Sequence, residues 1–249
     1  MQKFLIIIGI IIIALFIAIY FESYIIYFFR LIIREIKHNR TIKRLMNKNK
    51  KRRLYKNKIL KKYVDYTKSK LEKINYKPKK IYKLDSYLEQ RIKYSKFDDK
   101  ILNELLKNIF EYLNLDFSKI SFDIRRTSSK SRTAIAGSYN EDIKKIILEV
   151  TTYSSLDKII STLAHESTHH LLLSNGIELK KRNENEVLTD VTAIYLGFGD
   201  YFFNAYKEES RIIYDGEFTE LIDRNKLGYI GYGDVKYVQK YSNKVKRKK

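Results

Sequence analysis

The most constraining feature of this chain is residues 165–169, His-Glu-Ser-Thr-His, which have the spacing H-E-x-x-H. Residues four apart lie one above the other on an α-helix, so the spacing requires a helix here and places both imidazoles on one face. The chain has only four histidines, and three of them, His165, His169 and His170, fall within six residues. A chance match is rare in so histidine-poor a chain. The alternative, a helix with two satisfied core histidines, is therefore the weaker interpretation.

Two imidazoles on one helix face are typical of a metal site. Zinc binds imidazole nitrogen, and a catalytic zinc keeps three protein ligands and leaves a fourth position for water. The metal lowers the pKa of that water to about 7, and Glu166, next to the first histidine, is placed to accept its proton as general base. We therefore predict one zinc ion bound by His165 and His169, with Glu166 as the catalytic residue.

A third ligand is expected from the helix that follows. Glu186 and Asp190 are four residues apart, so both can face one point. Glu186 would complete a His-His-Glu site, and Asp190 would accept the remaining N–H of a ligand histidine. Taken alone, both would be solvated helix carboxylates, but the nearby H-E-x-x-H favours the ligand interpretation. Glu178 and Glu184 are weaker candidates, because neither has an acidic residue one turn later.

The two motifs together carry a resemblance. Residues 165–169 (H-E-S-T-H) followed by residues 185–190 (N-E-V-L-T-D) resemble the gluzincins, the thermolysin-type branch of the zincin metallopeptidases, over roughly residues 134–200. Residues 185–199 are also similar to small bacterial zincin-like proteins. The resemblance implies zinc held by His165, His169 and Glu186, with Glu166 as general base and Asp190 orienting a ligand.

The chain departs from that family in one respect. No histidine follows His170, whereas thermolysin-like enzymes have a downstream histidine that assists the oxyanion. A tyrosine or an arginine is then needed for that role, and the chain has 21 tyrosines. The candidates are Tyr206, Arg211, Tyr214, Tyr229 and Tyr232. The departure keeps a second hypothesis open, a catalytically inactive scaffold or binding domain.

The surrounding pattern predicts an α+β domain, mostly helical, with a small β-sheet before the metal-binding helix. Strands are expected over residues 120–125, 134–139 and 145–150, and such an edge can receive an extended peptide. Further helices are expected over residues 84–94, 98–115, 218–223 and 234–241. Ser154 with Asp157 predicts the start of the metal-binding helix, and Asn175-Gly176 predicts its end.

The N-terminal region predicts a membrane anchor. Residues 4–21 are eighteen residues without charge or proline, which is long enough to cross a hydrocarbon core and longer than a signal-peptide core of about 7–15 residues. Between Arg34 and Lys62, fourteen Lys or Arg are opposed only by Glu35. The positive-inside rule then predicts a single-pass protein of the cell membrane with its following domain in the cytoplasm. The basic stem would lie on anionic lipid.

These patterns divide the chain into an anchor (1–33), a basic juxtamembrane stem (34–80) and a zincin-like domain (81–249), with a boundary at Pro78, the only proline. The stem is expected to be a surface helix or a solvated linker. Although the net charge is +21, residues 81–243 contain 23 basic and 25 acidic residues, which disfavours nucleic-acid binding. We expect a membrane-anchored zinc hydrolase, a peptidase acting on a peptide or protein substrate.

Overall fold

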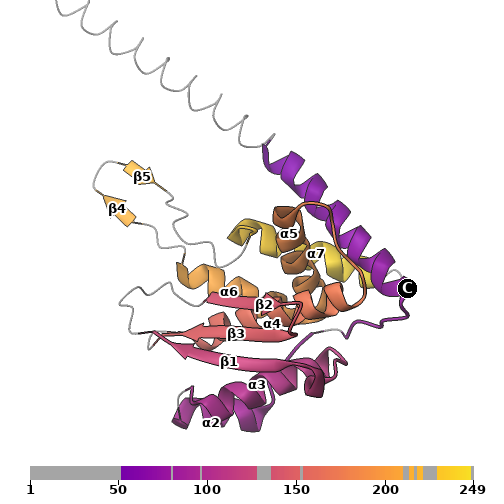
Figure 1. The fold of residues 1–249 in the computed structure, drawn as a ribbon. Coiled ribbons are helices and arrows are strands. Elements are labelled where there is room, and N and C mark those ends of the chain that lie inside the picture. The colour runs from indigo at the N-terminus through magenta and orange to yellow at the C-terminus, as the bar shows by residue number, and fades with distance from the viewer. Residues whose placement is uncertain are drawn as a thin grey trace, which may run out of the picture. The chain divides into compact units, whose positions relative to one another are not determined.

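The computed structural model describes residues 52–79, 81–95, 97–127, 136–151, 154–209, 213–215, 218–220 and 229–247. The chain divides into two units, Met1–Lys56 and Asn57–Lys249. The larger unit is α+β and mostly helical, as predicted (Figure 1). The anchor predicted at residues 4–21 lies outside the described residues. Among those that are described, no helix is long and apolar enough to cross a membrane.

A three-stranded sheet is formed by β1 (Ser121–Arg126), β2 (Ala136–Asn140) and β3 (Lys145–Val150), in the order β1-β3-β2. β1 pairs with β3 in parallel and β2 pairs with it antiparallel, which leaves β2 at one edge. In β3 every second side chain, at Ile146, Leu148 and Val150, is buried, the period of a strand with one face in the core. The predicted strands are confirmed, with bounds that differ by at most two residues.

The central element is α4 (Leu156–Ser174), which carries H-E-x-x-H and contacts β2 and β3 (Figure 1). Its N-cap residue is Ser155, whose hydroxyl accepts a hydrogen bond from the Lys158 N–H at 3.4 Å. The predicted cap at Ser154 is wrong by one residue, because the Ser154 hydroxyl instead accepts from the Thr151 N–H at 3.0 Å. This hydrogen bond joins Thr151, directly after β3, to Ser154, two residues before α4.

The end of α4 agrees with the prediction at Asn175-Gly176. Gly176 has a φ of 62°, a left-handed conformation that glycine adopts without a steric cost. The N–H groups of Gly176 and Ile177 donate back to the carbonyls of Leu173 and Leu172, at 3.0 and 2.9 Å. This double hydrogen bond closes the helix and directs the chain toward the next one.

The second motif lies on α5 (Arg182–Ala193), which packs against α4. A π-helical turn (Ile194–Phe198) then leads into α6 (Gly199–Glu209), which also contacts α4. Gly197 within the turn has a φ of 124°, and its carbonyl accepts a hydrogen bond from the Tyr82 N–H at 3.1 Å. The Tyr112 hydroxyl donates to the Leu196 carbonyl at 2.8 Å. The bend thus lies between two successive helices that both pack against α4.

A helix over residues 52–73 enters the larger unit at Asn57. Leu60, Val64 and Leu71 are buried in the core, and the Thr67 hydroxyl is 2.9 Å from that of Thr192 on α5. The compact unit thus begins before the boundary expected at Pro78, because these aliphatic side chains gain about 1.5–3 kcal/mol each by burial. Residues 57–73 of the predicted stem therefore form a helix and are not a solvated linker.

The remaining helices are α2 (Ser86–Ser95), α3 (Asp99–Tyr112) and α7 (Tyr232–Lys246). All three were predicted, and α7 is longer than the predicted 234–241. The helix predicted over residues 218–223 is wrong at its start, where β5 (Phe218–Glu220) pairs antiparallel with β4 (Ile213–Asp215). The sequence between them is Gly216-Glu217, and glycine in the first position of a two-residue connection is a hairpin signal.

Candidate metal centre

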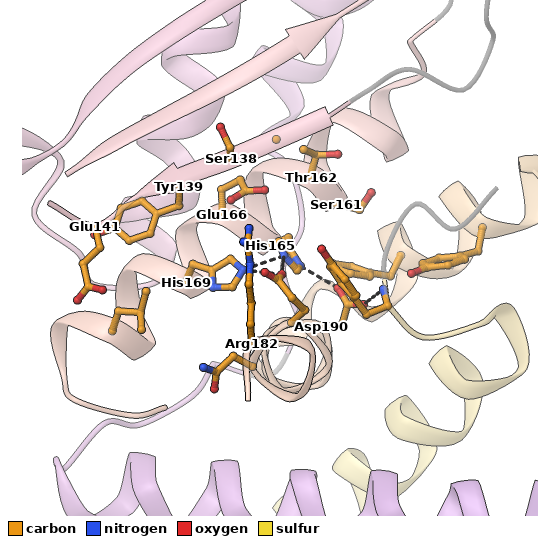
Figure 2. Close-up of a pocket in the computed structure, with 17 residues that line it drawn as sticks. Ser138, Tyr139, Glu141, Ser161, Thr162, His165, Glu166, His169, Arg182 and Asp190 are labelled. Carbon is orange, nitrogen blue, oxygen red and sulfur yellow. Dashed lines mark hydrogen bonds and ion pairs between the residues drawn. The ribbon is translucent and has the colours of Figure 1, made fainter. Parts of the chain in front are cut away.

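Three donor atoms from α4 and α5 converge at one point. Nε2 of His165 and Nε2 of His169 are 3.0 Å apart. Oε2 of Glu186 is 3.2 Å from the first and 3.0 Å from the second. The side chains of His165 and His169 lie next to each other in Figure 2, and all three side chains are 13–14 % exposed. The predicted His-His-Glu group is therefore brought together, and it can hold a metal ion.

The spacing of these atoms fits one small cation. A tetrahedral ion with bonds of about 2.0–2.2 Å has ligand atoms about 3.3 Å apart or slightly more, close to the separations of 3.0–3.2 Å found here. Two imidazole nitrogens and a carboxylate oxygen are also the donors that zinc accepts. Three lone pairs that faced one another would repel, so the group favours a cation between them, either a proton or a metal ion.

The second nitrogen of His165 is held by a buried carboxylate. Asp190 Oδ1 accepts a hydrogen bond from Nδ1 at 2.8 Å. Asp190 Oδ2 accepts from the backbone N–H groups of Tyr229 and Ile230, at 2.7 and 3.3 Å. With Nδ1 protonated, Nε2 presents its lone pair to the metal position. Asp190 thus has the orienting position that the sequence predicted, and it also fixes the segment before α7.

The second nitrogen of His169 is held by a neutral group that the sequence reasoning missed. The Thr189 hydroxyl donates to the Asn185 carbonyl at 2.9 Å and lies 3.2 Å from His169 Nδ1. Because that hydroxyl proton is already used, the oxygen accepts the Nδ1–H of His169. The ring is therefore oriented in the same way as that of His165. Threonine within N-E-x-x-T-D was the signal for this role.

The ionisation of the site favours a bound cation. Burial alone lowers the pKa of His165, but hydrogen bonds to Asp190 and Glu186 outweigh it and raise the pKa well above its ordinary value. Burial raises the pKa of Glu186, yet the hydrogen bonds to His165 and His169 hold it well below the usual range. The group thus attracts a proton when it has no metal, and a metal ion can take that proton's place.

Glu166 lies deep beside the donor atoms, 5 % exposed. Burial raises the pKa of Glu166, and the two ligand histidines oppose that shift. Its carboxylate occupies the space that a side chain on Gly137 of β2 would fill, since a Cβ there would lie 2.5 Å from Oε1. The absence of a side chain at Gly137, which the sequence reasoning also missed, therefore makes room for the Glu166 carboxylate.

The donor atoms open into a pocket of about 780 Å³. It is lined by residues of β2, α4, α5 and α6 and by Tyr229. In Figure 2, Ser138 and Tyr139 of β2 lie on one side of His165 and His169, and Arg182 and Asp190 of α5 lie on the other. The lining residues outside the metal group and its immediate neighbours include Ser138, Tyr139, Glu141, Ser161, Thr162, Leu173, Arg182, Asn185, Phe202, Tyr206 and Tyr229.

The five oxyanion candidates are separated by their positions. Tyr206 and Tyr229 line the pocket. Tyr232 does not line it, and its ring packs against Phe203 with centroids 4.7 Å apart. Arg211 lies outside the described residues, and Tyr214 is in β4, whose side chains the structure does not describe. Of the two that remain, Tyr229 has a contact with the metal group, because its ring stacks on that of His165 with centroids 6.2 Å apart.

The weaker ligand candidates stay away from the donor atoms. The Glu184 carboxylate pairs with Lys181 at 3.1 Å, and neither Glu184 nor Glu178 lines the pocket. Arg182 does line it, although the sequence reasoning overlooked this residue. Its spacing of four residues before Glu186 could have identified it, since both lie on one face of α5.

Comparisons of the chain with protein-family models, with curated proteins and with solved structures give no match. The interpretation of this centre therefore depends on its own geometry and chemistry.

Proposed function

We propose that this chain is a zinc-dependent hydrolase of the zincin type, most consistent with a peptidase. One observation carries the proposal: His165, His169 and Glu186 present three donor atoms within 3.2 Å of one another, with a buried glutamate beside them. A purely structural zinc site is closed by four protein ligands. Here three are found among the described residues, and the group faces a pocket, which favours an open, catalytic site.

When bound, zinc makes a water acidic and polarises a carbonyl. Glu166 accepts the proton of the attacking water and returns it to the leaving amine. Its raised pKa suits the first step, because a more basic carboxylate accepts the proton of the water more readily. The hydroxyl of Tyr229 donates a hydrogen bond to the oxyanion that develops on the substrate, the role that a histidine fills in the gluzincins.

The edge of the sheet supports a peptide as substrate. β2 pairs with β3 alone among the described strands, and its residues Ser138 and Tyr139 line the pocket. An extended peptide can add to such an edge by backbone hydrogen bonds. Tyr139 is fixed there, since its hydroxyl is 2.9 Å from Nδ1 of His170.

The test is the substitution Glu166→Gln in the full-length protein. We expect it to retain one zinc ion and to lose peptide hydrolysis by about a thousandfold, the contribution of a general base. Cleavage of a peptide library is followed by mass spectrometry. Glu178→Gln is the matched control, because Glu178 is an exposed carboxylate outside the pocket and outside the metal group.

A second function, an inactive metal-binding scaffold, is favoured by the lack of any histidine after His170. It predicts that Glu166→Gln changes neither metal content nor any cellular property. Equal turnover by the wild type and Glu166→Gln would refute the hydrolase mechanism. A loss confined to Glu166→Gln would refute the scaffold.

We also propose attachment to the cell membrane through residues 4–21, with the domain in the cytoplasm and the basic residues of 34–62 on anionic lipid. The uncharged run and the cluster of fourteen basic residues support this. Deletion of residues 4–21 is expected to move the protein from the membrane to the soluble fraction of cells. Retention of the deleted form in the membrane fraction, even in high salt, would contradict the anchor.

A further inference from the structure

One cationic side chain faces the pocket. Arg182 is the only lysine or arginine among the described residues that line it. It is the first residue of α5, one turn before Glu186, and Figure 2 shows its side chain extending from that helix into the site. Its neighbour Lys181 instead pairs with Glu184 at 3.1 Å. The two adjacent cations therefore have different surroundings, and only Arg182 is available to a ligand of the pocket.

The acidic groups near Arg182 already have other partners. Glu186 is bonded to both ligand histidines, and Asp190 to His165 and to backbone N–H groups. Neither carboxylate needs the guanidinium of Arg182, and with described residues that guanidinium forms no ion pair. A guanidinium offers two parallel N–H donors that match the two oxygens of a carboxylate.

The other walls direct an acidic group toward Arg182. The β2 side of the pocket carries Ser138, Tyr139 and the exposed Glu141, and a like charge at Glu141 repels a carboxylate. Arg182 and Tyr229 both line this pocket. The positive charge of Arg182 therefore lies in the same pocket as the tyrosine that we propose for the oxyanion.

We propose that Arg182 is a specificity-determining residue that binds a carboxylate of the substrate, next to the bond that is cleaved. This inference rests on the proposed function of the metal centre. It assigns the substrate to acidic peptides, in which the carboxylate is either an aspartate or glutamate side chain or the C-terminus of the chain.

The test measures binding and does not require turnover. The probes are short peptide hydroxamates, in which the hydroxamate binds the metal and the peptide lies in the pocket. Three probes of equal length are compared: one with a glutamate side chain and an amidated C-terminus, one with glutamine and a free C-terminus, and one with glutamine and an amidated C-terminus. Each is titrated into the full-length, zinc-loaded protein, its Arg182→Gln variant and its Lys181→Gln variant.

We expect the wild type and Lys181→Gln to bind one of the charged probes about tenfold more tightly than the neutral probe, as a charge-assisted hydrogen bond allows. Arg182→Gln should lose this preference and bind the neutral probe with unchanged affinity, which also shows that the variant is folded. The charged probe that is preferred identifies the source of the carboxylate.

Equal binding of all three probes by the wild type would overturn the role of Arg182 and leave the metal centre intact. A preference for charge that survives in Arg182→Gln would overturn it as well. Failure of the zinc-loaded protein to bind any hydroxamate would refute the proposed function, and the inference with it.

Discussion

The metal side of the pocket and its exposed rim are built in different ways. On the metal side, Asp190 and Thr189 are buried and tie His165 and His169 to the core. At the rim, Arg182 and Tyr229 are exposed. We therefore expect metal binding to be coupled to folding, whereas substrate recognition should depend on side chains that can change while the fold remains.

The largest effect on zinc affinity is expected from His169→Ala, which removes a donor atom from the metal side. Structural zinc sites with four protein ligands bind the ion with about 10–16 kcal/mol, which is a few kcal/mol for each ligand. Loss of one ligand should therefore lower the zinc affinity at least a hundredfold. His170→Ala is the matched control, because His170 stacks on Phe110 and lies outside the metal group. Competition with a chelator measures both, and equal losses would contradict the distinction between the two residues.

Tyr229→Phe tests whether the rim acts independently of the metal side, because it should lower kcat without lowering zinc affinity. Loss of one oxyanion donor typically costs about a hundredfold or more in kcat, while zinc affinity should stay the same, since Asp190 is bonded to the backbone of residue 229 and not to its ring. Tyr232→Phe, outside the pocket, serves as control. A fall in zinc content with Tyr229→Phe would show that the rim is not independent of the metal side.

Asp190→Asn tests the buried hydrogen bond to His165 directly. Loss of such an orienting partner weakens metal binding by about 10–100-fold, and we expect a value in this range by titration calorimetry. Asp200→Asn is the control, because Asp200 is bonded to Gln239 on the exposed surface of α6. Unchanged affinity in Asp190→Asn would mean that the carboxylate only anchors the segment before α7.

The pH dependence follows from the two opposite pKa shifts. In the metal-free protein the raised pKa of His165 stabilises the fold below its ordinary value of 6.5, and this contribution is lost as the pH rises through the raised pKa. The lowered pKa of Glu186 stabilises the fold above 4.5, and this contribution is lost in acid. The metal-free protein should therefore be most stable between these two values.

Zinc competes with the proton on His165, so its affinity should fall about tenfold for each pH unit below that raised pKa. Thermal unfolding with and without zinc, from pH 8 to pH 5, measures both effects. The Tm gain from zinc should shrink as the pH falls. A Tm gain from zinc that stays constant over this range would contradict the idea that a proton and zinc compete for His165.

The smallest effect is expected from Thr189→Val, which keeps the side-chain shape and removes the neutral acceptor of His169 Nδ1. We expect zinc affinity to fall several-fold, less than in Asp190→Asn, because a neutral hydrogen bond is about half as strong as a charged one. Thr189→Ser should restore most of the loss. A larger effect than in Asp190→Asn would reverse the ranking of the two orienting groups.

The metal side could be predicted from the sequence because helical periodicity converts spacing into position. Residues 165 and 169 had to share a face, as did residues 186 and 190, and two strand-like segments around a polar turn predicted the sheet. The rim could not be predicted in the same way. Tyr229 is one of 21 tyrosines, and it reaches His165 only because its backbone is held by Asp190, a contact between residues 39 positions apart.

Two other segments also differ from what the sequence predicted, each for a reason found within the segment or its pairing partner. The helix that reaches the core through Leu60, Val64 and Leu71 is so rich in lysine that it resembles a solvated linker. Residues 218–220 form a strand through pairing with residues 213–215, and no periodic pattern of three residues can predict such pairing.

The most direct measurement of the central claim is X-ray absorption at the zinc edge of the full-length, zinc-loaded protein. One zinc ion per chain should show two imidazole ligands and oxygen ligands at about 2.0–2.2 Å, and His165→Ala should remove one imidazole. Zinc that binds with fewer than two imidazoles, or in the same way in His165→Ala, would contradict a centre formed by His165, His169 and Glu186.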